Sequence, residues 1–356
     1  MFHRILVINP GSTSTKVGVY INEQPLCVST IRHTVEELMQ YEQIIDQHDF
    51  RQQLVIDWLK ANDIPFEFDA IIGRGGLIKP IPGGVYRVNR KMVYETYYAL
   101  RKHACNLGCI IAYELAKQQQ NGCKAYIADP VTVDELLPEA RVSGSPLMPR
   151  LAIWHALNQR AIARRYASEI GSQYEDLDLI ICHLGGGISI AAHQKGRAVD
   201  ANNALDGEGP LSPERAGTLP AADLIHLCYS GRYTEDQLKK RVAGQAGLMA
   251  HLGTTDILQI MQQVEAGDAH AKLLIDAMIF HTAKAIAAEG AVFSGQVDAI
   301  LITGGMAHSK YITQGIASRV KFIAPVHLFP GEDEMEALAL NALSVLRGEC
   351  VAKEYE

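Results

Sequence analysis

Two hydroxyl groups and an ammonium group recur at every second position near the start of the chain, at Ser12, Ser14 and Lys16. Apolar runs at residues 5–8 and 17–20 flank them, and a Pro-Gly pair lies between the runs, so the pattern predicts strand, turn and strand. Side chains two residues apart share one face of an extended chain, and this face suits a phosphate group. A polar hairpin end with a surface lysine is the alternative that such a turn favours on its own.

Two later apolar runs, residues 178–184 and 298–303, also stop at glycines. The glycines that follow them are Gly185, Gly186, Gly187, Gly304 and Gly305. A glycine at the end of a strand lets the backbone approach a ligand closely. Three such turns, the first with two serines and a lysine, predict a nucleotide held in a cleft between two related halves.

Four more side chains that could bind an anion or a metal ion lie where predicted strands, helices or rigid loops begin or end. Arg74 stands between two glycines after an apolar run, and Asp129 ends another run ahead of a proline. His155 lies near the start of a predicted helix, and Arg215 lies in a loop that contains two prolines. Open α/β sheets bind ligands beyond the carboxyl ends of their strands, which favours a functional role. A solvated arginine, a turn-forming Asp-Pro pair and a core histidine are the structural alternatives.

The three glycine turns together resemble the phosphate and adenosine motifs of the superfamily of actin, hexokinase and the heat-shock ATPases. The matching segments read Asn-x-Gly-Ser-x-Ser-x-Lys from Asn9, His-Leu-Gly-Gly-Gly from His183, and Thr-Gly-Gly from Thr303. Within this superfamily the chain is similar to the acetate and butyrate kinase family in particular, over essentially its whole length. The resemblance implies an α/β fold of two related ribonuclease H-like domains, the actin-like ATPase fold. Each domain would have a mixed sheet flanked by helices, with the nucleotide cleft between the two.

The resemblance also assigns roles to residues, with ATP or ADP and Mg²⁺ as cofactors. The nucleotide-binding residues that it implies are Asn9, Ser12, Ser14, Lys16, His183, Gly185, Gly186, Gly187, Gly304 and Gly305. The catalytic residues that it implies are Arg74, Asp129, His155, Arg215 and Glu334. In this assignment the arginines flank the carboxylate and the transferred phosphoryl group, and His155 and His183 are paired hydrogen-bond donors. Asp129 and Glu334 hold the metal ion.

A carboxylic acid as phosphoryl acceptor explains why several cations would gather in one site. Such an acid, with a pKa of about 4, is ionised near neutral pH and needs no general base. Its carboxylate must approach an anionic phosphoryl group, and two unit charges ~4 Å apart repel by about 4 kcal/mol in a partly wet site. Positive side chains offset this repulsion, and phosphoryl transfer asks little else of a protein. The predicted reaction is the reversible transfer of the γ-phosphoryl group of ATP to butyrate, which gives ADP and butanoyl phosphate.

Other acceptors stay open as alternatives. Trp154 stands where acetate kinases have a phenylalanine before the matching histidine, which favours butyrate over acetate, with isobutyrate and propionate as further choices. A sugar or polyol kinase or a phosphohydrolase of the same superfamily is a second alternative, in which Asp129 would be the general base. That reading leaves the two arginines without a role. A nucleotide-driven switch is a third alternative, but the sequence has no appended peptide-binding segment to support it. A P-loop NTPase is disfavoured because residues 11–16 lack the Gly-Lys-Ser/Thr ending of a P-loop.

The elements that would position these residues follow from hydrophobic periodicity. Residues 35–61 predict two helices, and the second carries Phe50, Leu54 and Trp58 on its core-facing stripe. Further along, the pattern predicts a long helix at residues 93–119 with Leu100 on its apolar face, a helix at residues 150–170, a strand at residues 320–326 and a last helix that opens near Glu334.

The length of 356 residues exceeds what one hydrophobic core usually serves, so two domains are expected. The breaker-rich segment 143–149 marks the boundary. The expected lobes are residues 1–148 with 331–356, and residues 149–330 with the adenosine site.

The net charge of −7 and the lack of a basic run disfavour nucleic acid as a partner. Seven cysteines without a C-x-x-C pair predict neither a disulfide framework nor a zinc site.

Nothing in the sequence predicts a membrane partner. The amino terminus leads directly into a strand, without a signal-like segment. The most apolar long stretch, residues 273–293, contains His281, Lys284 and Glu289, which excludes a membrane span. We therefore expect a cytoplasmic enzyme whose partners are a small carboxylate and its acyl phosphate. A homodimer is expected from the family resemblance alone.

Overall fold

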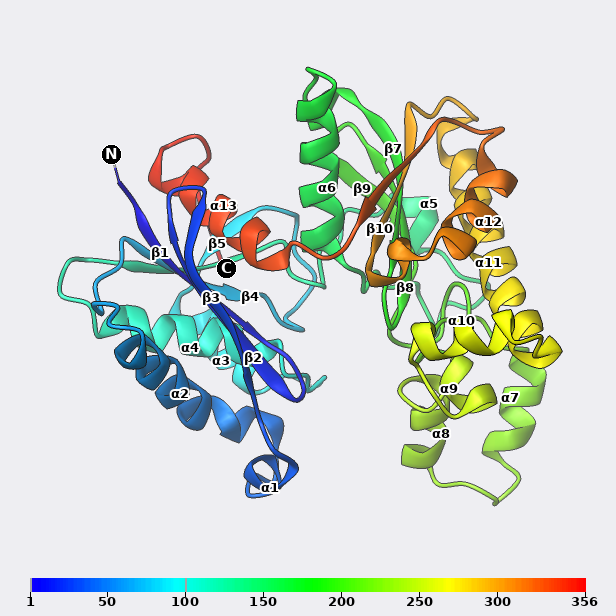
Figure 1. The fold of residues 1–356 in the computed structure, drawn as a ribbon, viewed down its shortest axis with the longest axis horizontal. Coiled ribbons are helices and arrows are strands. Elements are labelled where there is room, and N and C mark those ends of the chain that lie inside the picture. The colour runs from blue at the N-terminus through cyan, green and yellow to red at the C-terminus, as the bar shows by residue number, and fades with distance from the viewer. Residues whose placement is uncertain (1, 100) are drawn as a thin grey trace. The chain divides into compact units, whose positions relative to one another are not determined.

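The computed structural model describes residues 2–99 and 101–356, and the chain divides into two compact units (Figure 1). The first unit runs up to Val133 and takes in Asp333–Glu356, and the second is the continuous segment Asp134–Glu332. The boundary expected at residue 148 therefore lies further along the chain than the observed one, because residues 134–148 pack with the second unit. The role expected of each lobe stays a prediction.

The first unit is organised around a mixed sheet. Its strands are β1 (Arg4–Pro10), β2 (Ser14–Ile21), β3 (Gln24–Arg32), β4 (Ala70–Arg74), β5 (Val85–Arg87), β6 (Lys124–Ala128) and β12 (Lys353–Glu354). Its helices are α1 (Val35–Leu38), η1 (Ile44–Gln47), α2 (His48–Ala61), α3 (Arg90–Tyr97), α4 (Asn106–Lys117) and α13 (Glu334–Leu346). The strand order is β12-β5-β6-β4-β1-β2-β3. β4 runs parallel to both β1 and β6, whereas β1, β2 and β3 pair antiparallel.

The second unit repeats this arrangement. Its strands are β7 (Asp178–Leu184), β8 (Ile188–Gln194), β9 (Arg197–Ala201), β10 (Ala299–Gly304) and β11 (Val326–Pro330). Its helices are α5 (Pro138–Arg141), α6 (Ala156–Glu169), η2 (Tyr174–Asp176), α7 (Ala221–Cys228), α8 (Glu235–Val242), α9 (Gly247–Leu252), α10 (Ile257–Glu265), α11 (Ala269–Glu289), η3 (Gly290–Phe293), η4 (Gly305–His308) and α12 (Lys310–Val320). The order β9-β8-β7-β10-β11 has the same pairing directions as β3-β2-β1-β4-β6. The expected fold of two related α/β domains with mixed sheets is confirmed.

Alternation along the strands explains how the second sheet is covered on both faces. Ile180 and Cys182 of β7 pack in the core that α11 and α12 complete, whereas Leu179 and Ile181 pack against Tyr166 of α6. Successive side chains of a strand point to opposite faces, so a run that is apolar at every position belongs to a strand buried on both sides. Figure 1 shows α6 on one side of this sheet and α11 with α12 on the other. No helix within the described ranges is long and apolar enough to cross a membrane.

The prediction of one long helix at residues 93–119 is wrong. The structure has two helices there, α3 and α4, and Leu100 lies outside the described residues. The side-chain oxygen of Asn106, the first residue of α4, accepts a hydrogen bond from the Leu77 N–H at 2.8 Å. A Cβ on Gly108 would lie 2.5 Å from the Arg74 carbonyl oxygen, so α4 packs directly on the end of β4. Tertiary packing thus fixes where α4 begins.

Two further expectations are corrected by burial. On α2 the fully buried stripe is Arg51, Val55 and Leu59, one position beyond the predicted one. The strand predicted at residues 320–326 is wrong, because Val320 is the buried last residue of α12 and the strand β11 starts only at Val326. An apolar run too short to show a period does not distinguish a helix end from a strand.

The carboxyl group of Glu289 links stability to pH in the second unit. The positive charge that acts on it is Arg150, but Arg150 pairs with Asp200 at 3.0 Å and with Glu208 at 2.6 Å. Burial first, and then the negative charge of Asp200, raise the pKa of Glu289 to about 8 from its ordinary 4.5. The folded protein therefore holds this proton more tightly than the unfolded chain between those two values. Its contribution to stability is complete below pH 4.5 and is lost as the pH rises through about 8.

We expect Glu289→Gln to leave the melting temperature nearly unchanged at pH 5 and to raise it by several degrees at pH 9, because the amide resembles the protonated carboxyl group and cannot ionise. Thermal unfolding followed across this pH range measures the effect. Glu139→Gln, at an exposed position of the same unit, should follow the wild-type curve throughout. If the curves of melting temperature against pH ran parallel for Glu289→Gln and the wild type, the prediction would be contradicted.

Candidate active site

Three predicted site residues lie at one edge of the first sheet. β1, β4 and β6 are neighbouring parallel strands, so their carboxyl ends meet at the same edge. Ile8 pairs with Gly73 and Arg74 pairs with Ala128, which places Asn9, Arg74 and Asp129 at or just beyond these ends. The register of the sheet, rather than closeness in sequence, brings an amide, a guanidinium and a carboxylate to one edge.

Glu334, the first residue of α13, joins two of these groups. Its Oε1 forms an ion pair with the Arg74 guanidinium, and its Oε2 accepts a hydrogen bond of 2.8 Å from Asn9 Nδ2. Arg74 is 7% exposed and Asn9 8% exposed. A buried charge requires a partner of opposite charge and further hydrogen bonds. The Asn9–Glu334–Arg74 cluster therefore holds all three side chains in one geometry.

Asp129 is held in a backbone conformation that is uncommon for its residue type. Its φ is +38°, and its side chain is completely buried. Its N–H donates to the Gly84 carbonyl at 3.0 Å, and its Oδ1 accepts from the Gly84 N–H at 2.7 Å. A non-glycine residue at positive φ costs on the order of 1–3 kcal/mol and occurs preferentially at functional sites. The two hydrogen bonds to Gly84 hold the conformation in place.

The first turn has the predicted form of strand, turn and strand. Ser14 and Lys16 lie on the face of β2 opposite to the buried Thr15, and Ser12 lies in the turn itself. Among the described residues, no side chain bonds to the side chains of Ser12, Ser14 or Lys16. The turn thus presents these groups outward, as a phosphate-binding role requires, and that role stays a proposal.

Arg51 supports this turn from the inside. Its Nη1 donates to the Gly11 carbonyl at 2.7 Å and to the Ser14 carbonyl at 3.0 Å, and its Nη2 donates to the Ser12 carbonyl at 3.2 Å. Burial lowers the pKa of Arg51 to about 10, so the group is charged at neutral pH. Burial and then the Arg51 charge lower the pKa of His33, which contacts Thr15, to about 4. The buried Arg51 guanidinium therefore holds the backbone of this turn in place.

In the second unit, two predicted residues stack on each other. The rings of His155 and His183 are 3.9 Å apart and nearly parallel, at 15°. His183 is the next-to-last residue of the strand β7, and its Nδ1 lies 2.8 Å from Asn158 Oδ1. Its Nε2 lies 3.1 Å from a carboxylate oxygen of Glu332, which is an ion-pair distance without the alignment of a hydrogen bond. Glu332 is a contact that no sequence motif indicated.

His155 does not lie inside a helix that starts at residue 150. It occupies the N-cap position of α6, which begins at Ala156. The preceding segment is extended, because Ile153 bridges to Asn203 and its carbonyl accepts from the Ala204 N–H. Trp154 is 2% exposed, and its ring meets the ring of His193 edge-on at 5.4 Å. This edge of the indole therefore packs in the interior of the unit.

Arg215 lies beside the second glycine turn. The Gly186 carbonyl accepts from Ser212 Oγ at 2.7 Å and from the Glu214 N–H at 3.0 Å, which fastens the proline-rich loop to the hairpin between β7 and β8. Arg215 Nη1 lies 3.1 Å from a Glu214 oxygen. A Cβ on Gly187 would lie 3.6 Å from the Arg215 side chain. The structure thus brings the predicted arginine and the predicted phosphate turn together.

The side chains that Gly185 and Gly304 lack would collide with their neighbours. A Cβ on Gly185 would lie 2.8 Å from His183 Nε2. Gly304 has φ of +95°, and its Cβ would lie 2.4 Å from the Leu184 carbonyl oxygen, where β10 ends beside its parallel neighbour β7. Nothing within 4 Å would meet a Cβ on Gly305, which faces open space.

A pocket of about 790 Å³ lies entirely within the second unit, beside these turns. Gly185, Gly186 and Gly305 line it together with side chains of α10 and η4. Its apolar wall consists of Ile257, Leu258, Met261, Met306 and Tyr311. Small-molecule sites typically have this size and this mixture of apolar walls with a few polar groups. The predicted adenosine turn therefore opens into a pocket that can hold a nucleotide base and sugar.

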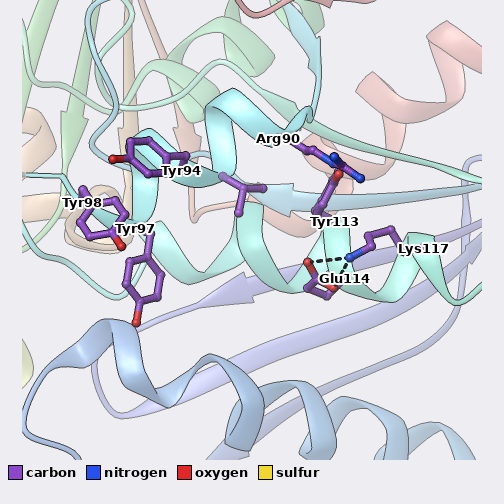
Figure 2. A pocket seen from close by; sticks show the side chains of 8 residues that line it. Arg90, Tyr94, Tyr97, Tyr98, Tyr113, Glu114 and Lys117 are labelled. Atoms are coloured by element: carbon purple, nitrogen blue, oxygen red, sulfur yellow. Dashed lines mark hydrogen bonds and ion pairs between the residues drawn. The ribbon is translucent and has the colours of Figure 1, made fainter.

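A second pocket, of about 500 Å³, lies between α3 and α4 of the first unit (Figure 2). Tyr94, Tyr97, Tyr98 and Tyr113 surround it. None of the predicted site residues lines this pocket, so it is separate from the candidate active site.

Similarity to known proteins agrees with this geometry. The acetokinase family matches residues 152–324. A protein of Bacteroides thetaiotaomicron named probable butyrate kinase is 63% identical over 353 residues, which cover 99% of this chain and 100% of that protein. The chain belongs to the acetokinase family. A protein of Phocaeicola vulgatus with the same name is 49% identical over 352 residues, 99% of each chain.

This member of the acetokinase family also shares its fold with a solved structure. The crystal structure of Porphyromonas gingivalis acetate kinase superposes with a TM-score of 0.78 over 97% of this chain and 100% of that one, at 16% identity. So low an identity supports the fold alone. The two relatives confirm the family resemblance that the glycine turns indicated, and this structure confirms the expected fold.

Proposed function

We propose that this protein is a short-chain carboxylate kinase that transfers the γ-phosphoryl group of ATP to butyrate. Membership of the acetokinase family supports the reaction class, and the two relatives named probable butyrate kinase support the acid. The structural observation that carries the proposal is the Asn9–Glu334–Arg74 cluster. It fixes a buried guanidinium at the carboxyl ends of the parallel strands β1, β4 and β6, where α/β proteins bind their ligands.

In the proposed reaction a carboxylate oxygen of the acid attacks the γ-phosphorus, and the bond from that phosphorus to the bridging oxygen of ADP breaks. The acid is already ionised, so no side chain needs to remove a proton. Arg74 and Arg215 would offset the repulsion between the acid and the phosphoryl group, and His155 and His183 would donate hydrogen bonds to the phosphoryl oxygens. Ser12, Ser14, Lys16 and the glycines of both turns would hold the nucleotide phosphates.

Asp129 and Glu334 suit the proposed magnesium site by their chemistry. Magnesium at phosphoryl-transfer sites prefers oxygen ligands and takes one or two carboxylates, with waters and phosphate oxygens as the rest. Among the described residues, no cluster of three or more histidine, cysteine or acidic side chains is placed to hold a metal ion. When bound, the ion would offset part of the negative charge of the nucleotide phosphates.

A panel of acids tests the proposal. The protein is incubated with ATP, Mg²⁺ and hydroxylamine, which traps an acyl phosphate as a hydroxamate, and with acetate, propionate, butyrate, isobutyrate or valerate. We expect the largest kcat/KM for butyrate and no ADP release with sugars. Failure with every acid would overturn the reaction class, and a larger kcat/KM for another acid would overturn only the choice of butyrate. The homodimer and the cytoplasmic location stay predictions.

A further inference from the structure

Behind His155 lies a row of buried polar side chains, all in the second unit. From the inside outward, Tyr174 Oη lies 2.6 Å from His193 Nδ1, and His193 Nε2 lies 3.0 Å from Gln159 Oε1. Gln159 Nε2 lies 2.9 Å from Ser189 Oγ, and Ser189 Oγ lies 2.8 Å from His155 Nδ1. Gln159, His193 and Ser189 are completely buried, so bulk solvent does not reach them.

The orientation of Gln159 follows from a backbone group. The atom assigned as Nε2 lies 3.1 Å from the Ser189 carbonyl oxygen as well as near the Ser189 hydroxyl. A carbonyl oxygen only accepts, so this atom must be the amide nitrogen and not the oxygen. The amide oxygen must then face His193, and it accepts the hydrogen of His193 Nε2.

His193 carries that hydrogen in a neutral ring. Burial, with a smaller effect from Arg160 and Arg164, lowers the pKa of His193 well below its ordinary value. A neutral imidazole with its hydrogen on Nε2 has an acceptor at Nδ1. Nδ1 therefore accepts from the Tyr174 hydroxyl, and every hydrogen bond so far points in one direction, toward His155.

Ser189 continues this order of donors and acceptors toward His155. Its oxygen accepts from Gln159 Nε2, and at 3.3 Å from the backbone N–H of His155, which uses both lone pairs. The remaining hydroxyl hydrogen then has His155 Nδ1 as its acceptor. If His155 Nδ1 carried the hydrogen instead, three donors would face the two lone pairs of the Ser189 oxygen. The buried hydroxyl hydrogen of Ser189 would then have no acceptor among the described residues. Leaving such a group unsatisfied costs about 1–3 kcal/mol.

We infer that Ser189 and Gln159 are positioning residues that hold His155 as the neutral tautomer with its hydrogen on Nε2. The inference rests on the proposed function for its effect on turnover. A hydrogen bond donor is then available at Nε2 without a charge on the ring. This matters because the His183 ring lies 3.9 Å away. Two charged rings at that distance would repel each other by about 4 kcal/mol at an effective dielectric constant near 20.

The tautomer is measured directly by long-range proton–nitrogen NMR of ¹⁵N-histidine-labelled protein, with His155→Gln to assign the signals. In the wild type we expect a hydrogen on Nε2 of His155 and none on Nδ1. Gln159→Glu has nearly the same shape, but its carboxylate would accept the Ser189 hydroxyl hydrogen and so reverse the chain. In that variant we expect a hydrogen on His155 Nδ1. A hydrogen on Nδ1 in the wild type would overturn the inference.

Turnover gives the second readout. Ser189→Ala should lower kcat with butyrate about tenfold and change the KM for ATP less than about twofold, because a positioned donor is lost and no nucleotide contact is. Ser189→Thr restores the hydroxyl and should recover most of the activity. Tyr174→Phe is the matched control, since it removes the hydroxyl at the end of the row farthest from His155 and leaves the Gln159–His193 contact in place. Wild-type kcat in Ser189→Ala would also overturn the inference, whereas failure of the protein to phosphorylate any acid would leave the NMR result intact and count only against the proposed function.

Discussion

Arg74→Ala is expected to lower kcat for acyl phosphate formation by about 10²–10³-fold, the usual effect of removing one group that stabilises developing charge in the transition state. Two causes act together. The acceptor carboxylate and the phosphoryl group lose a cation between them, and Glu334 loses its buried ion-pair partner. The measurement is steady-state turnover with butyrate, together with calorimetric titration of ADP. ADP binding should change little, because the guanidinium is proposed to face the acceptor.

Two variants serve as controls for this result. Arg74→Lys keeps the charge but loses the planar fork, so it should fall between the wild type and the alanine variant. Arg87→Ala removes an exposed arginine of the same unit, whose Nη1 lies 3.9 Å from an oxygen of Glu354. This variant should retain turnover within about twofold. Wild-type turnover in Arg74→Ala would mean that the acceptor site is elsewhere.

Arg51→Met is expected to destabilise the first unit by at least about 3 kcal/mol and to raise the KM for ATP. The substitution removes the buried charge beneath the first turn and leaves the carbonyls of Gly11 and Ser12 and the side-chain oxygen of Gln47 without this donor, whereas the Ser14 carbonyl keeps the Gly11 N–H. Each buried acceptor left unsatisfied costs about 1–3 kcal/mol. The turn that presents Ser12, Ser14 and Lys16 would then lose its fixed geometry, so phosphate binding should weaken as well.

Thermal unfolding and ATP titration of Arg51→Met measure the two effects. Arg32→Met is the matched control, since Arg32 is an exposed arginine at the end of β3 in the same unit. It should change stability by no more than about 0.5 kcal/mol. If Arg51→Met melted and bound ATP like the wild type, the turn would hold its shape through its own backbone hydrogen bonds.

The parts of the site that sequence could predict are those carried by local chemistry. Apolar strands that end in glycine, serine and lysine indicated the turns, and the rule that ligands bind at the carboxyl ends of parallel strands indicated Arg74 and Asp129. The motif match supplied Glu334, which lies far away in sequence. The structure brings Glu334, Arg74 and Asn9 into direct contact.

The parts that sequence could not predict depend on contacts between distant segments. Arg51 looks like the polar side of an amphipathic helix, and only the position of the first turn makes it a core residue. The start of α4 depends on how closely Gly108 approaches the Arg74 backbone, which no helical period encodes. Glu332 and Ser189 carry no motif, because each acts through a histidine that is near in space.

The path of the chain has a consequence for how the protein is made. The second unit is one continuous segment, whereas the first needs Asp333–Glu356, which are synthesised after the whole of the second unit. α13 packs on β1 and β4 and carries Glu334, and β12 adds the edge of the sheet beside β5. A nascent chain can therefore finish its later-encoded half before its earlier-encoded half. Until residues 333–356 have been synthesised, the sheet of the first unit lacks the helix α13 and the edge strand β12 that complete it.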